Sequence, residues 1–500
     1  EDSRKWPVRE TCKQGVGRYL IAMGGSESKE SDNRTSVHFT EEEKPRVSTL
    51  FHRISHGKKT FNRDQFRHFT HGVLDPEICE RLYELLHGAK HLHNYGKRSH
   101  EGEVDHHHFA QHLAAILKGG VHEQAVLLTS LVSPDHDDVL PEHLVKFVSS
   151  LVQSFEKIVA AHCRQYQSWI FAPAKDGYRR LALYMLEDLF TSGSRKDRGY
   201  SLPLVPKDIM YSTPDLENWI VKSTLFQQIF HEVFHACFRL YDQDPADVVF
   251  LHPRIPQVCD TNWSKVKTIL DLPSVLFLNA NLRSELQGEW RLLFNNALHG
   301  DSFSQLAKIL EGRGPTLLVL QDREGSIFGG FASHPWNINP KFYGDERCWL
   351  FRLNPNFGVY SASGYNANFM YLNMNMQTLP NGLGMGGQLN YFGLWVEHTF
   401  NQGHSKAEPR CTTFGSPQLS KSAEFQVDIL EVWLVGPQKK KDDDYDTEEE
   451  ERVAHKSVLD KDPAAKAMLE MIGKGPVSEG LREGDEMADT PESNKVISLF

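Results

Sequence analysis

Between Leu272 and Gly436 the chain reads, in order, SVLFLNANL (274–282), LHGDSFSQL (298–306), FGGFAS (328–333), GLGMGGQ (382–388), YFGLWVE (391–397) and FQVDILEVWLVG (425–436). These blocks decide the fold. Most are short runs rich in β-branched and aromatic residues, and Gly, Asn, Pro and Asp separate them about every ten residues. The pattern predicts many short strands with turns between them, and therefore a β-sandwich.

The predicted strands are SVLFLNA (274–280), TLLVLQD (316–322), IFGGFAS (327–333), CWLFRLN (348–354), FGVYSAS (357–363), FMYLN (369–373), YFGLWVE (391–397) and ILEVWLVG (429–436). Two further runs have helical spacing of their apolar residues, LRSELQGEWRLLFNNAL (282–298) and DSFSQLAKILEG (301–312). The stretch is therefore predicted to be α+β.

Two details of this stretch suggest close packing. Gly329 and Gly330, and the glycines of GLGMGGQ, precede or occupy strand-like runs rather than open a helix, so we expect turns or close backbone approach and not a phosphate loop. In the final strand, Trp433 is predicted to be a core anchor, with Glu431 beside it as a buried or bridging polar partner.

The ordered blocks resemble the TLDc domain family. The resemblance implies a β-sandwich without an accepted catalytic constellation, so we expect binding and regulation, no enzymatic activity and no cofactor. Members of this family are linked to resistance against oxidative stress and to binding of the vacuolar proton pump (V-ATPase). With the flanking features described below, the chain is most similar to a lysosomal branch of the family that supports mTOR signalling.

Bulk properties are those of an ordinary globular protein. A chain of 500 residues with 40% hydrophobic and 24% charged residues is predicted to form two to four domains. The net charge of −11 argues against a protein that mainly binds nucleic acid. The seven cysteines are scattered and never spaced C-x-x-C, which fits reduced thiols in the cytosol. No segment has ~18 uninterrupted apolar residues.

Near the start, Met23 is followed by Gly24-Gly-Ser-Glu-Ser28, which matches the N-myristoylation pattern. We expect translation to start at Met23 and Gly24 to carry the myristoyl group, with 1–22 a non-native extension; the alternative is an ordinary disordered leader. Residues 23–39 are then a flexible N-terminus. One acyl chain binds membranes only weakly, so a second attachment, most simply a protein partner, is expected. The resemblance implies that this membrane is the cytosolic face of the lysosome.

Residues 40–165 have helical spacing and three loops that resemble EF-hand loops. If Phe61, Val104 and Val139 occupy the eighth loop position, the twelfth position falls on Gln65, His108 and His143. Calcium needs a bidentate carboxylate there, and none of the three supplies one. We interpret the region as an EF-hand-like scaffold, with a calcium-responsive switch as the alternative. Residues 166–270 are predicted to be a further helical region.

His231, Glu232 and His235 form the motif H-E-x-x-H, in which two histidines on one helix face can bind zinc and the glutamate can act as general base. The motif fits a zinc-dependent hydrolase, but no third ligand is evident, because Tyr241 stands where a histidine would complete the extended pattern. The same residues also continue the polar stripe of an amphipathic helix, and this interpretation is favoured.

After the predicted TLDc domain (271–437), the acidic run in 438–451 indicates a charged linker. Residues 452–475 contain a predicted helix, capped at Asp462 and Pro463. The segment 476–500 reads as a disordered tail. The apolar stripe of the helix is expected to bind a partner, although docking on its own domain remains the alternative. The stripe includes Ala467, Met468, Met471 and Ile472.

Overall fold

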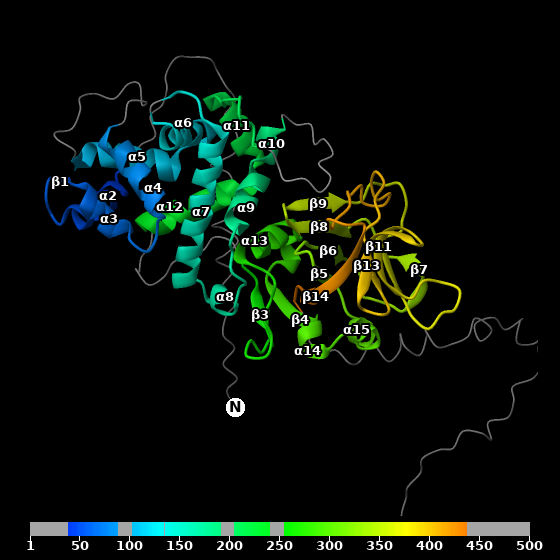
Figure 1. Cartoon of the computed structure of the whole chain (residues 1–500). Helices are drawn as coiled ribbons and strands as arrows, with labels where there is room; N and C mark the ends of the chain where they lie inside the picture. The colour runs from blue at the N-terminus through cyan, green and yellow to red at the C-terminus, as the bar shows by residue number, and fades with distance from the viewer. Residues whose placement is uncertain (1–38, 89–102, 135, 192–204, 241–254, 438–500) are drawn as a thin grey trace, which may run out of the picture. The chain divides into compact units, whose positions relative to one another are not determined.

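The computed structural model describes residues 39–88, 103–134, 136–191, 205–240 and 255–437. Helices fill the first part of these ranges and strands the last part, which confirms the predicted α+β class with a helical N-terminal half (Figure 1). None of the helices in these ranges combines the length and apolar character that crossing a membrane requires. The predicted N-terminus, charged linker and C-terminal helix lie outside the described residues.

The helical half is built around one long helix, α7 (Pro141–His162), which packs against α4, α9 and α12. Its companions are α2 (Lys44–Ser55), α3 (Arg63–Thr70), α4 (Pro76–His87), α5 (His106–Lys118), α6 (Val121–Val132), α8 (Arg164–Gln167), α9 (Gly177–Met185), α10 (Glu187–Phe190), α11 (Thr213–Lys222) and α12 (Thr224–Phe238). Local signals start several of them: Asn62 and Gln65 form a capping box at α3, and the Asp75 carboxylate caps α4.

Twelve of the described strands, β3 to β14, form one sheet, and this sheet folds back on itself into a sandwich. Its order is β7-β10-β11-β12-β13-β14-β5-β6-β8-β9, with β4 beside β14 and β3 beside β4. The strands are β3 (Gln257–Cys259), β4 (Glu289–Asn295), β5 (Thr316–Asp322), β6 (Ile327–Ala332), β7 (Asn339–Tyr343), β8 (Trp349–Asn354), β9 (Gly358–Ser361), β10 (Met370–Asn373), β11 (Gly382–Gln388), β12 (Tyr391–Glu397), β13 (Gln402–His404) and β14 (Glu424–Val435).

The long strand β14 joins the two layers of the sandwich. Its first residues pair with β13, and the residues from Val427 onward pair with β5, so one strand belongs to both layers. Side chains from both layers then meet in a shared core, in which Leu318 and Val432 from one layer lie with Leu383 and Leu394 from the other. The predicted sandwich is confirmed, with α15 (Phe303–Leu310), also predicted, packed on this core.

The predicted strand at 274–280 is wrong, because these residues form α13 (Leu272–Asn281). The Asp271 carboxylate caps this helix by accepting from the backbone N–H of Ser274 at 2.9 Å, and Pro273 occupies its first turn. Every residue from 272 to 279 is buried, so the helix is apolar on all sides. Periodicity cannot distinguish such a helix from a buried strand.

The predicted helix at 282–298 is also wrong. These residues form a 3₁₀ turn, η1 (Ser284–Leu286), then β4, and then a four-residue helix, α14 (Asn296–His299). β4 pairs with β14 on one side and with β3 on the other, so backbone pairing outweighs the helical spacing seen in the sequence.

The predicted close packing at the glycines of β6 is confirmed. A Cβ atom at Gly329 would lie 1.8 Å from the carbonyl oxygen of Leu318 on β5, and one at Gly330 would lie 2.5 Å from the sulfur of Met385 on β11. The absence of a side chain at Gly329 lets β6 lie close to β5, and its absence at Gly330 lets the two layers lie close together.

One outer face of the sandwich is covered by the helical half. Alternate residues of β5, β6, β8 and β14 belong to the same apolar core as α7, α9 and α12, among them Val319, Phe351 and Trp433. At the junction, Trp169 stacks on Phe171 and lies 5.1 Å from Trp433, measured between ring centroids. Trp263 and Trp290 complete a cluster of four tryptophans.

A buried ion pair adds a polar contact at this junction. Arg180, on α9, donates to the Asp271 carboxylate at 3.1 Å and to the Asn354 side-chain oxygen, at the end of β8, at 2.8 Å. Its guanidinium also lies 5.6 Å from the centre of the Phe357 ring. One arginine therefore connects α9, the cap of α13 and the sandwich; α9 and α13 lie side by side in Figure 1.

Replacing this arginine provides a test of the junction. We expect Arg180→Ala to lower the free energy of unfolding by about 2–4 kcal/mol, because Asp271 is left buried without its cation. The neighbouring Arg179→Ala is the matched control: Arg179 pairs with Glu142 on the surface, so its loss should cost less than about 1 kcal/mol. Urea unfolding of both variants measures the difference, and equal losses would contradict the assignment.

Candidate functional site

The zinc-like motif lies on α12, which packs against α5, α7 and α11. Glu232 is only 6% exposed, and the rings of His231 and His235 stack with their centroids 3.8 Å apart. Burial, followed by the charge of His231, lowers the pKa of His235 to about 3, so this imidazole is neutral at physiological pH. The predicted polar stripe is half-buried: His231 and His235 keep intermediate exposure, Glu232 is buried, and the apolar arc of α12 packs inside the helical half.

A zinc site needs at least three protein ligands. Within the described ranges, no three His, Cys, Asp or Glu side chains gather in a way that could hold a metal ion. Tyr241, the residue at the expected third position, lies outside those ranges. The structure thus adds no further ligand to His231 and His235.

Two of the EF-hand-like loops pair with each other. β1 (Thr60–Phe61) lies antiparallel to β2 (Val104–Asp105), with Phe61 opposite Val104, as expected if both hold the same loop position. The side chain of Gln65 accepts from the backbone N–H of Asn62 at 3.0 Å and donates to the Ser55 carbonyl at 3.2 Å. This twelfth-position residue therefore takes part in helix capping.

The other two twelfth-position residues have different surroundings. The ring of His108 contacts the Asp105 carboxylate at 2.9 Å. His143 lines a cavity of about 650 Å³ together with Glu77 of α4, and Glu77 already forms ion pairs with Arg81 and Lys146. On the cavity wall, Glu77 is thus compensated by basic side chains of this chain.

The predicted lipidation site Gly24 lies outside the described residues. So do Ala467, Met468, Met471 and Ile472 of the predicted C-terminal helix. Both remain predictions from the sequence.

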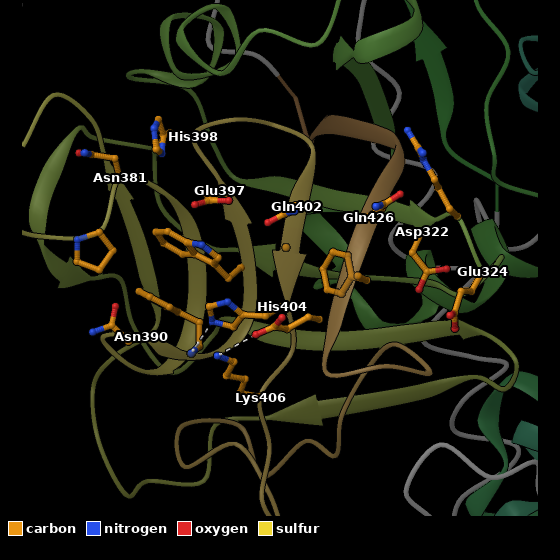
Figure 2. A pocket seen from close by; sticks show the side chains of 17 residues that line it. Asp322, Glu324, Asn381, Asn390, Glu397, His398, Gln402, His404, Lys406 and Gln426 are labelled. Atoms are coloured by element: carbon orange, nitrogen blue, oxygen red, sulfur yellow. Dashed lines mark hydrogen bonds and ion pairs between the residues drawn. The ribbon is translucent and has the colours of Figure 1, made fainter.

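Sequence reasoning missed a groove of about 770 Å³ on the sandwich. It runs across β12, β13 and the start of β14, between the turn after β5 and the loops beside β11. Figure 2 shows His404 near the middle of the groove, with Asn381 and Asn390 toward one end and Asp322 and Glu324 toward the other. The groove lies in the β10–β13 part of the sheet and across β14, and its exposed side chains include Gln402 and Gln426.

The floor of the groove is aromatic. Phe392 and Trp395 stack with ring centroids 4.3 Å apart, and His404 lies 6.0 Å from each. Glycine in the neighbouring strand makes this possible: a Cβ atom at Gly384 would lie 2.6 Å from the Phe392 ring and 2.9 Å from the Trp395 ring. The rings therefore lie directly over the backbone of β11.

The walls of the groove are polar and carry both charges. Burial, with a smaller contribution from Lys406, lowers the pKa of His404 to about 4, so its ring is neutral and its Nε2 accepts from the backbone N–H of Phe392 at 3.4 Å. Lys406 lies 3.6 Å from the Glu424 carboxylate, and the exposed Gln402 and Gln426 lie nearby. Such walls can hydrogen-bond a polypeptide surface, and the site has no evident nucleophile activated by a base.

The sequence does carry one signal for outward-facing side chains. In FQVD (425–428) and QGH (402–404), polar residues alternate with Phe425, Val427 and Gly403, as they do in a strand with one exposed face. The groove itself depends on the pairing of β12, β13 and β14, which are separated by loops of different length. Alternation alone could not reveal that pairing.

Comparisons with known proteins agree with the fold. The family model described as the TLDc domain matches residues 263–436. The MTOR-associated protein MEAK7 of Gallus gallus is 35% identical over 487 residues, which cover 93% of this chain and 99% of that protein. The Homo sapiens protein of that name is 35% identical over 476 residues, covering 92% and 99%.

A shorter similarity links the chain to a differently named protein. Nuclear receptor coactivator 7 of Mus musculus is 37% identical over 158 residues, which cover 31% of this chain and 16% of that protein. The resemblance to TLDc proteins seen in the motifs is thus confirmed, and the similarity to the first two proteins extends through the helical half as well. The chain belongs to the TLDc-domain family of the MTOR-associated protein MEAK7.

Proposed function

We propose that the protein is a non-catalytic peripheral adaptor at the cytosolic face of the lysosomal membrane. In this role it supports mTOR signalling and binds the V-ATPase through its TLDc domain and C-terminal helix. The observation that carries the mTOR part is the similarity, over nearly the whole chain, to proteins named for their association with mTOR. The V-ATPase and the lysosome come from the family resemblance.

The shape of the sandwich supports a binding role. One of its outer faces is covered by the helical half, whereas the groove around His404 has exposed polar walls. A partner that contacts the sandwich therefore has the groove side available. Within the described ranges, no cluster of three His, Cys, Asp or Glu side chains supports the zinc-hydrolase or the calcium-switch alternative.

Membrane attachment is proposed to need two contacts. A single myristoyl chain on Gly24 gives weak, reversible binding, so the protein partner supplies the rest. Loss of either contact should then release most of the protein from the membrane.

The acyl contact is tested by Gly24→Ala. We expect a several-fold smaller fraction of the protein on isolated lysosomes, because this change removes the acceptor amine. Gly25→Ala is the control, since it leaves the acceptor in place. Intact mass of the cellular protein shows whether Gly24 is terminal and acylated; an unmodified or internal Gly24 would contradict the proposal.

The helical contact is tested by Met468→Lys together with Met471→Lys. We expect at least about a tenfold weaker affinity for purified V-ATPase, because two apolar side chains leave the interface. Deletion of 476–500 is the control and should leave the affinity unchanged. Unchanged affinity of the double lysine variant would favour docking of the helix on its own domain.

The groove is tested by Gln402→Arg together with Gln426→Arg. Bulky cations on its wall should weaken V-ATPase binding by about tenfold, as expected when polar contacts at an interface are replaced by a charge without a partner. Gln305→Arg on α15 makes the same chemical change outside the groove and should bind normally. Equal affinities of the wild type, the double arginine variant and Gln305→Arg would show that the partner uses another surface.

A further inference from the structure

A carboxylic acid lies where the helical half meets the sandwich. Glu431 stands in the middle of β14, opposite Asn295 on β4 and Val319 on β5. Its side chain points to the covered face and has no exposure to solvent. The segment 265–271, which we call the strap, crosses above it and leads into α13.

Four donors surround this carboxyl group. One oxygen accepts from the Thr268 hydroxyl at 2.8 Å and from the Trp433 indole N–H at 3.0 Å. The other accepts from the backbone N–H of Ile269 at 2.9 Å and from the Asn295 amide at 3.3 Å. Two of the donors belong to the strap and two to the sandwich, so Glu431 holds the strap to the sheet.

No cation compensates Glu431: none of the described basic side chains forms an ion pair with it. His299 of α14 contacts the backbone of Asn295, the residue opposite Glu431 on β4. Asp271 of the strap is paired with Arg180, and Asp322 of β5 accepts from Ser326 and Ser420. The other titratable groups on the surrounding elements are not buried: Lys265, Lys267, Glu289, Arg291, Glu424 and Asp428.

The site can hold a neutral acid as well as a carboxylate. Three of the donors are N–H groups, which cannot become acceptors. The Thr268 hydroxyl can rotate, and its oxygen already accepts from the backbone N–H of Leu270 at 3.1 Å. When solvent supplies a proton to Glu431, the new acid O–H can donate to Thr268 Oγ1, and the other three bonds remain.

We propose that Glu431 and Thr268 form a proton-controlled latch, which holds the strap and the helical half against the sandwich and loosens when Glu431 ionises. Burial raises the pKa of Glu431 to about 7 in the closed structure, and the hydrogen bonds offset only part of this effect. If the strap lifts, the carboxyl group gains water and its ordinary pKa returns. Protons therefore favour the closed latch, which weakens as pH rises from about 4.5 through about 7.

In the closed structure Glu431 changes its charge near neutral pH, and the hold of the latch on the strap is expected to respond to pH there. Without Glu431, the packing of the four tryptophans at this junction would respond little to pH, because indoles do not titrate. The proposal concerns the internal junction of the chain and does not depend on V-ATPase or mTOR binding.

Hydrogen exchange of the strap tests the latch. In the full chain, we expect the protection factors of the Ile269 and Leu270 amides to fall about tenfold between about pH 6 and about pH 8, after correction for intrinsic exchange. Glu431→Gln cannot ionise, so its protection should not change with pH. His299→Gln removes the imidazole that contacts the backbone of Asn295 and should keep the wild-type response.

The tryptophan indole N–H signals give a second readout that requires no variant to fold. The Trp433 indole proton should shift with a midpoint near pH 7, because it is bonded to the titrating carboxyl group. A wild-type strap whose protection does not depend on pH would overturn the proposal. So would a flat Trp433 signal, or a pH response that survives Glu431→Gln but is lost in His299→Gln.

Discussion

Burial of one outer face of the sandwich under the helical half is the constraint on which the rest of the structure depends. Trp433 and Val319 point outward from their sheet, yet they belong to the core of the helices. Apolar side chains on both faces of a layer are stable only if both faces are covered. The tryptophan cluster, Arg180 and the strap all serve this contact, so the helices and the sandwich share one core although their secondary structures differ.

The sequence allowed prediction of the sandwich, α15 and the burial of Glu431 next to Trp433. It failed at α13 and β4 for opposite reasons. The run in α13 is apolar throughout, so it has no periodic pattern that distinguishes a helix from a strand. The β4 segment has helical spacing but forms a strand, because β14 and β3 pair with it. The groove also depends on long-range pairing, so local patterns could not predict it.

The covered face and the groove side of the sandwich differ in composition. The covered face is apolar, and the polar groups Glu431 and Arg180 are bonded inside it. The groove side has an aromatic floor, whose rings lie over the backbone of Gly384, and polar walls with both charges. A surface of this composition suits a reversible contact with a partner better than it suits chemistry.

The place of β14 in the chain has a consequence for synthesis of the protein. This strand is the last of the sandwich to be made, and it pairs with β4, β5 and β13. A ribosome therefore releases all earlier strands before the two layers can be joined. Until then the sheet under the helical half lacks the strand between β4 and β5, so the apolar core between the two layers is incomplete.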